Sequence, residues 1–204
     1  MSAEKTALNP MQELAEEDVL RAHLYRMLAG YLAHPPSQQA LEAAASMTGD
    51  ESDLGRAIQS FGRIANGVTV EQVDQEYHDL FIGLGRGELL PYASYYLTGF
   101  LMEKPLAKLR SDMDRLGIAR DEKVKEPEDH IAALMDMMAG LILGAFAEPG
   151  DLATQKQFYD GHIGVWAGHF FKDLEGAKSS VFYSALGTIG RVFMEIEETA
   201  FSMD

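Results

Sequence analysis

The chain has 204 residues, of which 47% are hydrophobic and 24% charged, a composition typical of a globular domain rather than of a disordered chain. Its 32 acidic and 17 basic residues give a formal charge of −15, which opposes phosphate backbones and argues against a nucleic-acid partner. The absence of cysteine excludes disulfides and thiolate metal sites. The first residues lack a basic segment followed by an apolar one, so we expect no secretion signal and a cytoplasmic location.

Helical periodicity dominates the first part of the chain. We expect residues 1–15 to be disordered or loosely attached. Apolar residues then recur every three or four positions from Leu20 to Tyr31, which predicts a helix that Pro35 and Pro36 end. Three further helices are predicted to begin at Ser37, at residue 52 and at the capping box that Thr69 and Gln72 form.

The middle of the chain contains a break in this pattern. After a glycine-containing loop at residues 83–91, the chain is predicted to turn helical, with Ser94 as a helix cap and with a kink or break at Pro105. Residues 118–126 have no apolar period and are interpreted as a hinge. The hinge divides the chain into an N-terminal helical half, 16–117, and a C-terminal helical half, 127–204.

The second half opens on an apolar run from Ile131 to Ala147 in which Asp136 is the one ionisable residue. Pro127 and its neighbouring carboxylates predict the first turn of this helix, because proline loses no hydrogen bond there and acids meet the positive end of the helix dipole. The run barely reaches the length of a bilayer span, so it is interpreted as a buried core helix and not as an integral membrane segment. Further helices around Leu152, Trp166 and Phe182 complete an all-α fold, a single compact domain of about nine or ten helices.

No arrangement of residues suggests catalysis. His162 and His169 lie seven apart, or about 10 Å along a helix, and no HExxH or His/Cys cluster is present, so we expect no metal, no cofactor and no enzymatic activity. Ser94 lacks the GxSxG context of a nucleophile. The alternating Gly83, Gly85 and Gly87 are a weak signal for a phosphate loop.

Three segments together resemble the TorD/DmsD family of redox-enzyme maturation chaperones. They are Glu76-Tyr77 with Leu80-Phe81, then Pro91-Tyr92 with Ser94 and Tyr96, and finally Glu126-Pro127 with Asp129-His130-Ile131. The resemblance implies an all-helical chaperone that binds the twin-arginine signal peptide on the precursor of a molybdenum-containing oxidoreductase and prevents export before cofactor insertion. It also makes a homodimer formed by exchange of one half worth considering.

A peptide-binding site with an apolar groove and an acidic rim is the expected consequence of this resemblance. We expect the groove at Phe81, Tyr92, Ser94 and Tyr96, and the rim at Glu126, Glu128, Asp129 and His130. Exposed ion pairs contribute only about 0–1 kcal/mol each, so the groove must supply most of the affinity and the rim orientation. Each residue also has a structural interpretation, since the carboxylates can cap a helix and the rings can belong to the core.

Two other functions remain open on the sequence alone. One is a GTP-binding or GTP-hydrolysing helical protein that uses the glycine loop and the hinge carboxylates. The other is a helical adaptor without peptide-binding activity.

Overall fold

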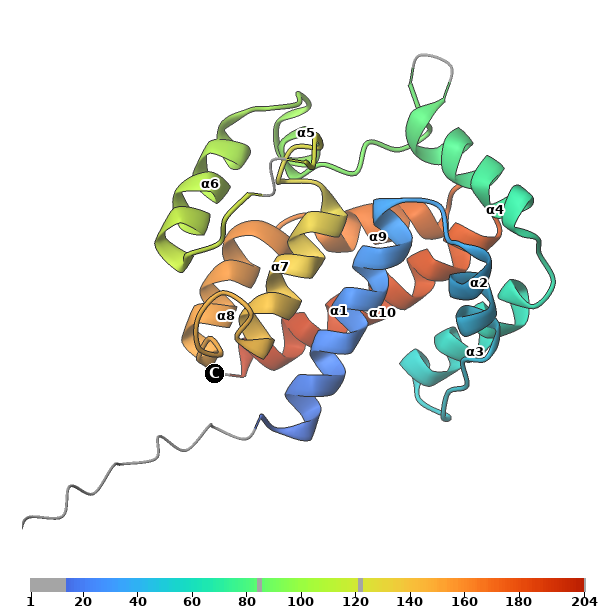
Figure 1. The fold of residues 1–204 in the computed structure, drawn as a ribbon, viewed down its shortest axis with the longest axis horizontal. Coiled ribbons are helices and arrows are strands. Elements are labelled where there is room, and N and C mark those ends of the chain that lie inside the picture. The colour runs from blue at the N-terminus through green and yellow to red at the C-terminus, as the bar shows by residue number, and fades with distance from the viewer. Residues whose placement is uncertain (1–13, 84–85, 121–122, 204) are drawn as a thin grey trace, which may run out of the picture.

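The computed structural model describes residues 14–83, 86–120 and 123–203, which form an all-helical body without a strand (Figure 1). This confirms the predicted fold class. The segment predicted to be disordered or loosely attached is residues 1–15, and residues 1–13 of it lie outside the described part. The described elements are α1 (Glu16–Ala33), α2 (Gln38–Ala45), α3 (Asp53–Ala65), α4 (Val70–Tyr77), the π-helical turn η1 (His78–Ile82), α5 (Ala93–Thr98), α6 (Lys104–Leu116), α7 (Ile131–Leu143), α8 (Leu152–Phe158), the π-helical turn η2 (Tyr159–Ile163), α9 (Ala167–Glu175) and α10 (Phe182–Ser202).

Short-range caps set the starts of the early helices as predicted. The Ser37 hydroxyl accepts a hydrogen bond from the Ala40 backbone N–H at 3.2 Å. In the capping box, Gln72 N–H donates to Thr69 Oγ1 at 3.3 Å, and Thr69 N–H donates to Gln72 Oε1 at 2.9 Å. These bonds satisfy backbone donors that the first helical turn leaves unpaired.

Two predicted boundaries are wrong. The helix after Pro91 ends at Thr98, where Gly99 adopts a left-handed φ of +81°, so the break predicted at Pro105 is present but begins earlier, and Pro105 lies in the first turn of α6. Proline is tolerated there because the first-turn N–H has no intrahelical partner. The helix predicted to begin at Pro127 begins at Ile131, after a turn that ends on His130.

The helices pack in two layers around one core. In Figure 1, α1 and α7 run side by side in front of α9 and α10, and α2 to α4 gather at the end of the long α10. Arg21 of α1 pairs with the fully buried Glu197 of α10 through Nε and Nη2, at 2.8 and 2.9 Å. Elements from both sides of the predicted hinge therefore share the core, and the proposed domain boundaries remain a prediction.

The apolar helix α7 is buried on most of its surface, as its composition predicts. Asp136 is exposed, so one side of the helix is open. No helix in the described residues is long and apolar enough to cross a membrane.

Candidate functional site

Two segments that lie far apart in the sequence form the centre of the candidate site. The backbone around Pro91 to Ala93 runs antiparallel to residues 129–131, with an isolated bridge between Tyr92 and His130. Ala93 N–H donates to the Asp129 carbonyl at 3.0 Å, and Ile131 N–H donates to the Pro91 carbonyl at 2.8 Å. The start of α5 and the start of α7 are therefore held together as one unit.

Asp129 is a buried cap of this unit. Its side chain is 1% exposed, and its Oδ2 accepts a hydrogen bond from the Ser94 backbone N–H at 2.8 Å. Its Oδ1 has no hydrogen-bond partner among the described residues. The carboxylate predicted to cap α7 or to face the ligand thus caps the first turn of α5.

Ser94 is not the helix cap that its sequence context suggested. It is the second residue of α5, and Tyr92 occupies the capping position. Its hydroxyl accepts a hydrogen bond from Met102 N–H at 3.2 Å, which attaches the connection between α5 and α6 to the unit. Ser94 is fully buried, so its role in the described structure is to position this connection.

His130 is the cap of α7. Its Nδ1 accepts a hydrogen bond from the Ala132 N–H at 3.2 Å, and its ring meets the Tyr92 ring edge-on with centroids 5.1 Å apart. Burial lowers the pKa of His130 to about 4, against the opposing influence of Glu126 and Asp129. The imidazole is therefore neutral near pH 7.

Glu128 joins α6 and the hinge to the site. Its Oε2 accepts hydrogen bonds from Arg110 Nη2 at 2.8 Å and Nε at 3.1 Å, and Arg120 lies 3.5 Å from its other oxygen. Burial disfavours the charged carboxyl, but the hydrogen bonds from Arg110 and the charges of both arginines outweigh it and lower the pKa of Glu128. Glu128 is 7% exposed and anchors both arginines, and its place in the acidic rim stays a prediction.

Glu126 is the member of the predicted rim that faces solvent. The Tyr92 hydroxyl donates a hydrogen bond to Glu126 Oε2. Burial, together with this bond and the charge of Glu126, raises the pKa of Tyr92, so the phenol stays a neutral donor. Tyr92 and Glu126 are thus held in one arrangement at the edge of the unit.

Phe81 and Tyr96 make their contacts elsewhere. Phe81 packs against Tyr77 and Tyr183, with ring centroids 5.0 and 5.7 Å apart. The ring of Tyr96 packs on Trp166, at 5.2 Å, and its hydroxyl donates to Asp173 at 2.9 Å. The structure therefore brings six of the eight predicted residues together and leaves these two against other parts of the core.

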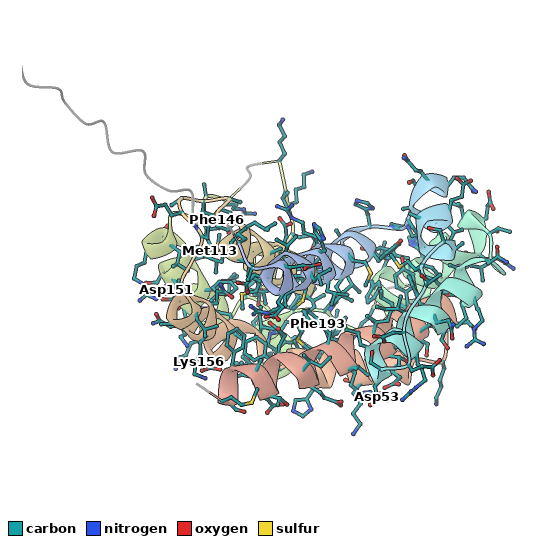
Figure 2. The ribbon with its side chains drawn as sticks, turned by 90° about the horizontal axis from the view of Figure 1, so that it is seen from below. Asp53, Met113, Phe146, Asp151, Lys156 and Phe193 are labelled. Atoms are coloured by element: carbon teal, nitrogen blue, oxygen red, sulfur yellow. The ribbon has the colours of Figure 1, made fainter. Side chains whose placement is uncertain are left out.

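A cleft of about 710 Å³ opens beside the unit, between α1, α7, the end of α6 and the hinge. Glu126, Glu128 and His130 line it, together with residues that sequence analysis did not select. Met113 and Phe146 are two of the latter, and Figure 2 labels both on the same side of the molecule. The remaining lining is mainly apolar or small and includes Ala29, Gly30, Ala33, Ile118, Val124, Pro127, Ala132, Ala133 and Met137, with Arg26, His34, Arg120 and Asp136 as polar members beside Ala119.

Small side chains leave the room for this cleft. Ala29 and Gly30 lie four and three positions before Ala33 on α1, so both are its neighbours one helical turn away, and Ala133 lies on α7. A Cβ added at Gly30 would meet no atom within 4 Å. This run of small residues is the signal in the sequence from which the cleft could have been found.

The fold and the cleft define a helical binding protein. Among the described residues, no group of three His, Cys, Asp or Glu side chains could hold a metal ion. The chain belongs to the nitrate reductase delta subunit family, which its residues 48–172 match, and within it to the TorD family of redox-enzyme maturation chaperones.

Individual relatives agree with this assignment. The chain is 28% identical to the chaperone protein TorD of Vibrio cholerae serotype O1 strain O395, over 91% of this chain and 93% of the relative. It is 25% identical to TorD of Aliivibrio salmonicida, over 92% and 97%. The crystal structure of a redox enzyme maturation protein from Archaeoglobus fulgidus has the same fold, with a TM-score of 0.58 at 22% identity, over 86% of this chain and 94% of that one.

The protein is therefore a TorD-family chaperone for molybdoenzyme maturation and not a catalyst. The hypothesis of a GTP-hydrolysing enzyme is not retained. The glycine loop on which that hypothesis rested includes residues 84 and 85, which lie outside the described residues.

Proposed function

We propose that the cleft binds the apolar segment of a twin-arginine signal peptide, on the cytoplasmic precursor of a molybdenum-containing oxidoreductase. The bound chaperone shields the signal from export until the cofactor has been inserted. The observation that supports this proposal best is an apolar cleft of about 710 Å³ beside the Glu126 to His130 segment. Its volume is in the range of ligand sites, about 300–1,000 Å³.

Burial of apolar surface supplies the affinity in this proposal. About 400 Å² of buried peptide surface corresponds to roughly 10 kcal/mol, at about 25 cal/mol per Å². Association costs about 4–15 kcal/mol. Since exposed ion pairs add only about 0–1 kcal/mol each, the arginines mainly set orientation. Glu126 and Asp136 are exposed carboxylates that line the cleft and are available to them.

A matched pair of glycine substitutions tests the site. Gly30→Met places a flexible side chain in the cleft, and Gly168→Met adds the same side chain on α9, where a Cβ would also meet no atom within 4 Å. We expect both variants to fold, because methionine has a higher helix propensity than glycine. Isothermal titration with a synthetic twin-arginine peptide should show at least about tenfold weaker binding for Gly30→Met and unchanged binding for Gly168→Met. Equal binding by both variants would place the peptide elsewhere.

The peptide provides an independent test. Replacing leucines of its apolar segment with serine should weaken binding more than replacing Arg-Arg with Lys-Lys, because apolar burial dominates. A larger effect of the lysine substitution would show that charge recognition dominates. If no twin-arginine peptide binds saturably, the result would favour an adaptor without a peptide site. Exchange of one half between two protomers remains a prediction, and it requires a dimeric mass in solution.

A further inference from the structure

A second cavity, of about 390 Å³, lies beside the cleft and has the opposite charge to the molecule as a whole. Lys104, Arg110, Arg120 and Lys125 line it, together with the carboxylate of Glu103. The whole chain carries a net charge of −15. Four cations and one carboxylate therefore line one cavity of a protein whose net charge is negative. We call this the cationic cavity.

The cationic cavity adjoins the apolar cleft. Arg120 and Pro127 line both spaces, so the cleft and the cavity are neighbours. Glu128, which lines the cleft, already pairs with Arg110 and Arg120 of the cavity. Lys104 and Lys125 are exposed, and no ion pair joins either of them to another residue of the described part of the chain.

The two spaces differ in the groups that they offer to a peptide. The cleft offers apolar walls with the exposed carboxylates of Glu126 and Asp136, and the cavity offers ammonium and guanidinium groups. Complementary charges on a bound partner fix its register and orientation. A peptide that is basic at one end, apolar in the middle and acidic at the other end would match both spaces at once.

We propose that the cationic cavity binds carboxylates of the client that follow the apolar segment of its signal peptide. This subsite rests on the proposed function of the cleft and gives the bound peptide a direction. Its arginines lie toward Asp136 on α7, and the chain leaves over Pro127 toward α6. Lys104 and Lys125 contact the client carboxylates, while Arg110 and Arg120 keep Glu128 in place.

Peptide titration against the full chain tests the subsite. Three peptides share the arginines and the apolar segment and differ by Asp-Asp after the apolar segment, Asn-Asn at the same place, or Asp-Asp before the arginines. We expect the wild-type protein to bind the first about threefold to tenfold more tightly than the second, as two partly exposed ion pairs allow. Salt at 0.3 M should reduce this preference. A gain for the third peptide equal to that for the first would overturn the assigned direction.

Two double variants locate the effect. Lys104→Gln with Lys125→Gln should abolish the preference for Asp-Asp, and Lys172→Gln with Lys178→Gln, at two exposed lysines that line neither space, should keep it. Thermal unfolding checks that both variants are folded. A preference that persists without Lys104 and Lys125, or that is missing in the wild type, would overturn the subsite and leave the cleft intact. If the wild type binds none of the three peptides, the proposed function itself fails.

Discussion

Replacing Asp129 with alanine separates a positioning role from direct contact with the peptide. The substitution removes the Oδ2 acceptor of the Ser94 N–H, at 2.8 Å, and leaves that donor unpaired beside a fully buried side chain. A hydrogen bond to a charged group contributes about 1.5–3 kcal/mol. Relief of a buried carboxylate whose Oδ1 has no described partner offsets part of this loss. We expect a net loss of about 1–2 kcal/mol in the free energy of unfolding.

The assay combines unfolding with binding on the same preparations. For a chain of this size, a loss of 1–2 kcal/mol lowers Tm by about 2–8 °C, which circular dichroism resolves. Asp129→Asn keeps an acceptor for Ser94 and should lose less than about 1 kcal/mol. Peptide binding by the alanine variant should weaken only as far as the folded fraction of the protein decreases. An alanine variant that unfolds at the wild-type midpoint and no longer binds peptide would refute this reasoning and make Asp129 a ligand contact.

Three further predictions concern pH, helix packing and the anchor on α6. The pKa of His130 is about 4 in the folded protein, below its unfolded value of about 6.5, so the unfolded chain takes up the proton first as pH falls. The stability that His130 contributes is complete above pH 6.5 and declines by up to about 3 kcal/mol toward pH 4. Urea titrations at several pH values should show a shallower decline in the free energy of unfolding for His130→Asn. Parallel declines for the variant and the wild type would contradict the assignment. Gly187→Ala should destabilise the protein by about 1–3 kcal/mol in urea titrations, because its Cβ would lie 2.4 Å from the Glu175 backbone nitrogen. The control Gly168→Ala should change the free energy of unfolding by less than about 1 kcal/mol, since its Cβ would meet no atom within 4 Å. Glu128→Gln should lower the free energy of unfolding by about 1–3 kcal/mol, because its charge-assisted hydrogen bonds with Arg110 are lost. The control is Asp114→Asn, at an exposed residue of α6. Equal unfolding midpoints for the two variants would show that Glu128 does not anchor α6.

Much of the helical order could be predicted from neighbouring residues. The capping box of Thr69 and Gln72 forms between residues three apart, so no distant part of the chain is needed to specify it. The apolar run after Ile131 could equally be predicted to be buried, because so few of its side chains tolerate water. These elements follow from propensity and periodicity, which act over one or two helical turns.

The sequence selected residues of the candidate site whose proximity only the structure shows, and their role in peptide binding stays a prediction. The resemblance selected Tyr92, Ser94 and residues 126–130, and the structure brings them together across about 35 positions of sequence through the bridge between Tyr92 and His130. The resemblance could not show that Asp129 caps α5 or that helix α7 begins only at Ile131. Both depend on which distant backbone donor reaches which acceptor. Phe81 and Tyr96 were placed in the groove because aromatic residues suit both a groove and a core.

By itself, the sequence determined an all-helical fold, most of its helices and, through three segments, the chaperone family to which the chain belongs. The tertiary structure alone decided where the cleft lies and which charges surround it. Helix formation depends on local spacing, whereas the cleft arises where the small residues of α1 face α7 and the hinge, and only packing determines which faces meet. The same packing places Lys104 of α6 beside Lys125 of the hinge and so creates a cationic cavity within an acidic protein.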